Sequence, residues 1–370
     1  MVWALLLIPL PAQAESLSEG VQQVVDSLDT GALDAAMAGQ NPFDATGGFR
    51  ETLRKIALGQ LTLDFDQALQ LFLGHFAKAA TASLWRLTRL AAPALIWSLM
   101  CRLSPGSGQP GRVICMMTIC VFLSSDLSDH TALCLESVER MSSGMQGLFP
   151  LLMTVMAAVG GSAGSMLMQP AVVASAGAMT ALIRHVTLPL GTLGAILTML
   201  CHLGSGMRLD RLASLAHQAA NWTLGLGFTI FIGVIMTRGV TAAAVDGVTL
   251  RTAKYALDNF VPVVGGLFAD TVDTLIGSGM LVHSALGVTG VILLCAWCIA
   301  PLCQTLAAAL MYRLAAALLQ PLAEGELLDC IHDFSRVLML LFVIQLCTAA
   351  MFMMLIAQII GVSGMTMMLR

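Results

Sequence analysis

Long uncharged runs are the feature that most restricts what this chain can fold into. Residues 284–311 and 337–360 are each long enough to cross a hydrocarbon core, which takes about 20 residues of helix. Only 11% of all residues are charged, against about 25% in an ordinary soluble domain, and the mean hydropathy is +0.85. Because a backbone in lipid must satisfy its own hydrogen bonds, we predict an all-α, polytopic membrane helix bundle.

Other apolar segments are shorter or interrupted, and together they predict about six to eight spanning helices. Two of them, on either side of Arg184 and His185, form either two short spans or one bent pair. Another contains Gly160, Gly161 and Gly164, a face of small residues that lets neighbouring helix backbones approach closely. The segments are 84–103, 113–125, 147–168, 171–183, 186–203 and 221–237.

Charges between the spans predict the orientation only weakly. The basic loops 102–112 and 204–220 favour the cytoplasmic side, which places an acidic loop at 126–140 and the segment 238–283 outside. The loop 313–336 departs from this pattern because acids exceed bases in it. Arg184 is either a buried charge, with Asp246 as a candidate partner, or a loop residue.

The N-terminus resembles a secretory signal. A short apolar core precedes Ala12-Gln-Ala14, so we expect a cleavable signal peptide over residues 1–14. Residues 15–83 then form an acidic, helical, extracytoplasmic segment ahead of a transmembrane bundle over 84–370. The segment is too small for a large core of its own, so it either packs on the bundle or a partner or remains a solvated arm.

Chemical motifs are scarce. The chain has no phosphate-binding loop, and Cys295 and Cys298 lie inside a spanning run where packing explains them better than metal or redox chemistry. Cys134 and Cys330 are the two cysteines expected in loops. A net charge of −4 argues against nucleic acid as a partner. The sequence therefore predicts no enzymatic activity, no catalytic residue, no metal and no cofactor.

Residues 251–283 form the most distinctive stretch. Pro262 lacks an amide proton and Gly265-Gly266 lacks side-chain restraint, so a helix entering at Lys254 should break there. A short amphipathic helix, about half of a membrane span, should then start near Leu267. We predict a re-entrant or interfacial element, the alternatives being a broken segment packed on the bundle and a helix lying flat at the membrane surface.

Asp270 and Asp273 are the best functional candidates from the residues alone. At a spacing of three residues their carboxylates share a helix face, which could hold a cation or relay protons if it lined a wet cavity. The alternative is that both simply face water on an interfacial helix.

This stretch also resembles a known family. The run from Lys254 to Gly266, Lys-Tyr-Ala-Leu-Asp-Asn-Phe-Val-Pro-Val-Val-Gly-Gly, is similar to the signature of the stage III sporulation protein AE family of endospore-forming bacteria. The likeness is specific over residues 246–290 and looser from Phe49 onward. The structural or functional candidates in it are Arg251, Lys254, Tyr255, Asn259, Phe260, Pro262, Gly265, Gly266, Asp270, Asp273 and Gly277.

The resemblance implies an integral-membrane component of a sporulation channel or secretion-like apparatus that links mother cell and forespore and is needed after engulfment. It implies a location in the mother-cell membrane around the forespore, within the lipid bilayer. The implied partners are other membrane and ring-forming proteins of the apparatus, a secretion-type ATPase and a forespore-membrane partner. The alternative function is a secondary transporter or permease with an acidic site at Asp270 and Asp273.

Overall fold

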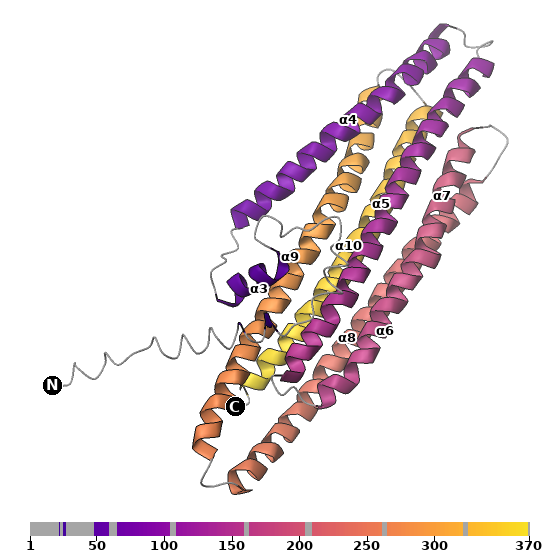
Figure 1. The fold of residues 1–370 in the computed structure, drawn as a ribbon. Helices are drawn as coiled ribbons and strands as arrows, with labels where there is room; N and C mark the ends of the chain where they lie inside the picture. Colours follow the sequence, from indigo (N-terminus) through magenta and orange to yellow (C-terminus); the bar gives the residue numbers. More distant parts are fainter. Residues whose placement is uncertain are drawn as a thin grey trace.

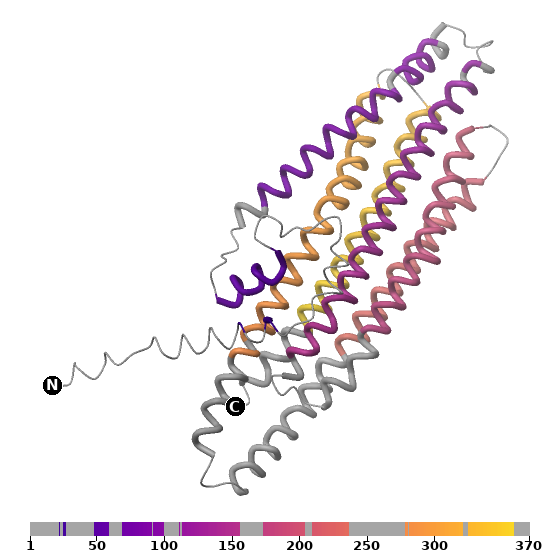
Figure 2. The backbone as a smooth tube through the Cα atoms, in the orientation of Figure 1, coloured from indigo at the N-terminus to yellow at the C-terminus, as the bar shows by residue number. Residues whose placement is uncertain are grey.

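The computed structural model is a bundle of long α-helices lying side by side (Figures 1 and 2). It describes residues 22, 25–26, 48–58, 65–103, 109–158, 163–203, 209–260, 265–320 and 325–368. This part of the chain is all-α, which confirms the predicted fold class. Its helices are α3 Phe49–Ala57, α4 Phe65–Leu103, α5 Gln109–Ala158, α6 Ala163–Leu182, a π-helical turn Ile183–Thr187, α7 Leu188–Cys201, α8 Asp210–Phe260, α9 Gly265–Leu319 and α10 Glu326–Met368.

Five segments of the described residues are long and apolar enough to cross a membrane. They confirm a polytopic membrane protein, while the predicted total of about six to eight spans remains a prediction. At 1.5 Å per residue, the 55 residues of α9 extend about 80 Å, well beyond a hydrocarbon core of about 30 Å. The five segments are Val113–Val155, Val173–Cys201, Asp210–Met236, Leu281–Leu319 and Glu326–Gln358.

Helix α9 is the central packing element. It contacts α10, α4 and α5, while α6 and α7 pack against α8 on the other side of α5 and α10 (Figure 1). Fully buried Leu123 of α5 and Leu338 of α10 belong to one continuous apolar core with Tyr312 of α9. The Ser335 hydroxyl donates a 2.9 Å hydrogen bond to the Ala309 carbonyl, joining α10 to α9.

The acidic loop predicted at 126–140 is wrong, because these residues form the middle of the continuous 50-residue helix α5. Three of its four acids, Asp126, Glu136 and Glu139, have partners on helices and therefore need no exposed loop. Glu136 pairs with Arg140 one turn along α5 at 2.5 Å, and Glu139 pairs with Arg184 at 2.7 Å. The predicted span 113–125 is likewise only the first part of α5.

The single span predicted over 147–168 is also wrong. Helix α5 ends at Ala158 and α6 begins at Ala163, so two helices and not one contribute to residues 147–168. Gly160 and Gly161 lie outside the described residues, and Gly164 is in the first turn of α6. Their packing role remains a prediction.

Helices α6 and α7 are joined without a break by the π-helical turn that contains Arg184 and His185. They form one candidate span, Val173–Cys201, which agrees with the bent-pair alternative and not with two short spans. Arg184 is neither a loop residue nor a buried charge. It is a half-exposed helical residue bound to Glu139 of α5.

The N-terminal helix α3 packs on the bundle. Its Phe49 and Leu53 are buried in a second apolar cluster with Leu152 of α5 and Leu286 of α9. For this helix, packing on the bundle is the correct alternative and a solvated arm is not. Residues 1–14 lie outside the described residues, and α4 runs continuously through the boundary placed between residues 83 and 84.

The break expected near Pro262 coincides with the interval between the end of α8 at Phe260 and the start of α9 at Gly265. The separate short helix predicted from Leu267 is wrong, because α9 continues to Leu319 with no proline before Pro301. The loop predicted over 313–336 is too long, because α9 continues to Leu319 and α10 begins at Glu326. Gly325, at φ 81°, turns the chain into α10, and its carbonyl accepts the Leu328 amide at 3.0 Å.

Candidate functional site

The stretch singled out in the sequence forms the end of α8 and the beginning of α9. Side chains of residues 237–277 lie outside the described part of the structure, as does the whole of Pro262. The geometry of Arg251, Lys254, Tyr255, Asn259, Phe260, Gly265, Gly266, Asp270, Asp273 and Gly277 is therefore untested, and their roles remain predictions.

The described helices bring together a different set of ionisable side chains, which we call the polar cluster: Arg86, Asp126, His130 and Tyr312. Asp126 and His130 are one turn apart on α5, so they share one face of that helix. Arg86 comes from α4 and Tyr312 from α9. Asp126 lies about 20 Å along the candidate span that begins at Val113, well inside its length.

Two hydrogen bonds lie within the polar cluster, and each joins one pair of its residues. The Tyr312 hydroxyl donates to the Asp126 carboxylate, and an Arg86 guanidinium nitrogen lies 3.2 Å from His130 Nε2. Asp126, His130 and Tyr312 are all buried, and Arg86 is half-buried. Ionisable groups held inside an apolar bundle are costly and usually serve a function, so the polar cluster is the best-defined candidate site in the described residues.

The contact with Arg86 fixes the state of the His130 ring. A guanidinium has only N–H donors, so Nε2 of His130 must accept, and the neutral ring carries its proton on Nδ1. That Nδ1–H has no hydrogen-bond partner among the described residues. An unsatisfied buried donor costs about 1–3 kcal/mol, so this arrangement of the ring is not a fully satisfied one.

Aromatic packing closes the site on the side of α10. The Phe334 ring meets the Tyr312 ring edge-to-face, with centroids 4.7 Å apart. This contact holds the Tyr312 hydroxyl toward Asp126 and brings no charge from α10. Helix packing therefore orients the tyrosine, and the carboxylate receives a fixed donor.

A second polar contact lies at the end of α7. His202 Nε2 is 3.3 Å from Asp333 Oδ2 on α10, and Arg336 is 3.3 Å from the other carboxylate oxygen. The hydrogen bond that the His202 ring donates to the Asp333 carboxylate raises the pKa of His202 above its ordinary value. The pair therefore joins α7 to α10 most strongly when His202 is protonated.

Replacing His202 with glutamine should lower thermal stability more at about pH 5.5 than at about pH 8.5. The folded-state pKa of His202 is raised, so its stabilisation is present below the unfolded pKa and is lost as pH rises through the folded one. We expect at most about 1 kcal/mol, since the pair is partly exposed. Thermal unfolding of the purified protein at both pH values measures it, with His75→Gln on α4 as control. Equal losses at both pH values contradict the prediction.

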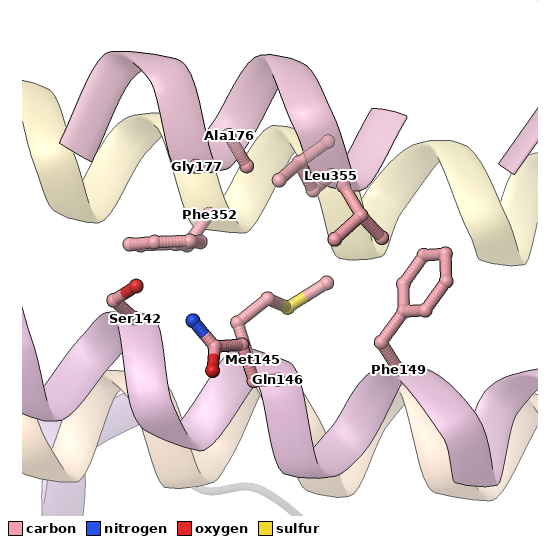
Figure 3. Close-up of a pocket in the computed structure, with 9 residues that line it drawn as sticks. Ser142, Met145, Gln146, Phe149, Ala176, Gly177, Phe352 and Leu355 are labelled. Carbon is pink, nitrogen blue, oxygen red and sulfur yellow. The ribbon is translucent and has the colours of Figure 1, made fainter. Parts of the chain in front are cut away.

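Figure 3 shows a small cavity between α5, α6 and α10. Its volume is about 70 Å³, and Ser142 and Gln146 are its polar groups among apolar neighbours such as Phe352. A groove of about 240 Å³ between α4, α9 and α10 is lined by apolar residues such as Leu87 and Leu314. The first space can hold a few water molecules, and neither approaches the size needed by a polypeptide.

The cysteines pack inside helices. The Cys298 thiol donates to the Cys295 carbonyl of its own helix at 3.5 Å, which fits the packing interpretation of that pair. Cys134 and Cys330 were predicted in loops, and that prediction is wrong, because both are buried in α5 and α10. In the described part of the chain, no group of three His, Cys, Asp or Glu side chains could hold a metal ion.

Sequence reasoning missed the polar cluster because it assigned Asp126 to a loop. One signal was available. Asp126 and His130, like Glu136 and Arg140, are four residues apart, a spacing that places each pair on one helix face. The contacts with Arg86 and Tyr312 join distant parts of the chain, and no local pattern reports them.

Fold and site together define a polytopic helical membrane protein with ionisable groups buried inside the bundle. The model of the family described as stage III sporulation protein AE matches residues 48–363. This chain belongs to that family, which confirms the resemblance seen in residues 254–266. Stage III sporulation protein AE of Bacillus subtilis (strain 168) is 33% identical over 235 residues, 64% of this chain and 59% of that protein. The match thus spans less than two-thirds of that relative, and no solved structure matches this chain.

Proposed function

We propose that this protein is an integral-membrane component of a sporulation channel or secretion-like apparatus that links mother cell and forespore. It acts after engulfment, in the mother-cell membrane that surrounds the forespore. The observation that carries the proposal is the family match over residues 48–363, which includes every described helix from α3 to α9 and most of α10.

The dimensions of the bundle support a role within a larger assembly. Its helices exceed the thickness of a hydrocarbon core, so part of the bundle is available outside the lipid. The two cavities noted in the described part of the chain are too small for a polypeptide, which favours a conduit that is formed together with further subunits. We propose as partners the other membrane and ring-forming proteins of the apparatus, a secretion-type ATPase and a forespore-membrane protein.

A secondary transporter is the alternative function. The polar cluster favours it, because buried ionisable side chains are typical of ion and proton pathways. An acidic site at Asp270 and Asp273 belongs to the same alternative and remains a proposal.

Purification of the full chain in mild detergent from sporulating cells tests the assembly role. We expect the ATPase and ring-forming proteins to copurify at fixed ratios, as identified by mass spectrometry. A protein that purifies without them, at the stage when the apparatus forms, contradicts the proposal.

Replacing Gly265 and Gly266 together with leucine should abolish spore maturation after engulfment while the protein still enters the membrane. Both glycines are the first residues of α9, and we expect bulky side chains at the two positions to crowd the packing there by about 1–3 kcal/mol per site. Spore yield and a membrane-fraction blot measure the effect in a strain that lacks its own copy. Full spore yield from the double variant would show that neither glycine is required for the function.

One control variant accompanies that experiment, and a second variant distinguishes the two candidate functions. Gly74→Leu lies on α4, where a Cβ would meet no atom within 4 Å, and should leave spore yield unchanged. Asp270→Asn with Asp273→Asn separates the two functions, because a transporter that uses these charges loses activity and a structural subunit tolerates the change.

A further inference from the structure

We propose that His130 is a proton-binding site inside the bundle and that proton uptake there releases α4 from α5. The inference rests on the geometry of the polar cluster and does not depend on the sporulation role. Its ligand is the proton, and its moving part is the contact between Arg86 and His130.

The Arg86–His130 contact and a protonated His130 exclude one another. His130 Nε2 now accepts a hydrogen bond from the Arg86 guanidinium, at 3.2 Å. When a proton from water forms an N–H bond at Nε2, the lone pair that Arg86 uses is gone, and two cations face each other. The Arg86 hydrogen bond must then break. Since Arg86 is half-exposed, it can turn toward solvent together with its helix.

Groups around His130 can stabilise its protonated state. Asp126 lies one turn away on the same face of α5, so its carboxylate can stabilise an imidazolium. Outside the polar cluster, the charged groups that act on its members are Asp129 of α5 and Arg89 of α4. From α10, Phe334 packs on Tyr312 and brings no charge.

The present state also leaves the Nδ1–H of His130 without a partner among the described residues. Its ring is 4% exposed, so water does not readily satisfy that group. Each protonation state thus satisfies different members of the polar cluster. In one, Arg86 binds His130 and Nδ1–H has no partner; in the other, Arg86 is released and the imidazolium faces Asp126. Such a pair of arrangements is a two-state element that a proton can bias.

Hydrogen exchange of the full chain in lipid nanodiscs, at about pH 3.5 and about pH 8, tests the proposal, because a buried ring beside a cation takes up a proton only below the ordinary titration range of histidine. After correction for the intrinsic pH dependence of exchange, amides of α4 around Arg86 should exchange about tenfold faster at the lower pH. Wild-type protein whose α4 amides show equal corrected rates at both pH values overturns the proposal, whatever the variants do.

Three variants assign the effect to His130. His130→Gln keeps an acceptor for Arg86 but cannot take up a proton, so exchange should be slow at both pH values. Arg86→Gln removes the cation that a protonated His130 repels, and its amide can donate to the neutral ring or accept from the protonated one, so the difference between the two pH values should disappear. His217→Gln is the matched control, because this half-buried histidine of α8 contacts Thr198 at 3.4 Å outside the polar cluster, and it should respond like wild type. A His130→Gln protein that responds like wild type rules out His130 as the site.

Discussion

Replacing Asp126 with leucine is expected to lower the free energy of unfolding by about 2–4 kcal/mol. The substitution leaves the buried Tyr312 hydroxyl without its acceptor. A leucine side chain fills similar space, so the loss arises from the uncompensated polar group and not from a cavity. Denaturant-induced unfolding of the purified protein in micelles measures it.

A double-mutant cycle separates the pair from its surroundings. Tyr312→Phe keeps the ring that packs edge-to-face on Phe334 and removes only the hydroxyl. Combined with Asp126→Leu it replaces both members of the pair by apolar groups, a change that is often close to neutral in buried sites. We therefore expect the double variant to be more stable than Asp126→Leu alone. Additive losses would show that the hydroxyl and the carboxylate do not interact in the folded protein.

The same cycle bears on the proposed proton site. The double variant keeps Arg86 and His130, so α4 remains docked on α5 at high pH. It lacks the carboxylate that stabilises the protonated ring, so release of α4 should need a lower pH than in wild type. Stability and proton response are thus measured on one variant and can be told apart.

The membrane class of the fold could be predicted because it depends on local composition. Runs such as 284–311 and 337–360 are apolar whatever surrounds them, and they lie within α9 and α10. The end of α8 at Phe260 was also predictable, because the restriction imposed by Pro262 belongs to that residue itself.

The middle of α5 could not be predicted in the same way. Its charges indicate a loop when they are counted along the chain, yet Glu139 is neutralised by Arg184 and Asp126 binds Tyr312. Those partners are contributed by helices that are distant in sequence, and only the folded bundle brings them together. Cys134 was misassigned for the same reason, since charged residues on both sides of it, such as Asp129 and Glu136, indicate a loop, while its thiol donates to the Leu341 carbonyl of α10.

Gly144→Ala should destabilise the bundle by about 1–3 kcal/mol, although alanine is the better helix former by about 1 kcal/mol. A Cβ at Gly144 would lie 1.9 Å from Cζ3 and 2.6 Å from Cη2 of the Trp297 ring. Trp297 is buried on α9, so its ring cannot move aside without displacing the core between α5 and α9. Thermal unfolding in detergent and the amount of folded protein in the membrane measure the loss.

Gly225→Ala is the same chemical change, yet we expect it to stabilise the protein and not to destabilise it. Gly225 lies on α8, where a Cβ would meet no atom within 4 Å, so only the helix-propensity gain of up to about 1 kcal/mol remains. Combining Gly144→Ala with Trp297→Leu should recover part of the loss, because the smaller side chain leaves room for the added methyl group. If both alanine variants shift the unfolding temperature in the same direction, α5 and α9 do not approach each other at Gly144 and Trp297 as closely as the structure shows.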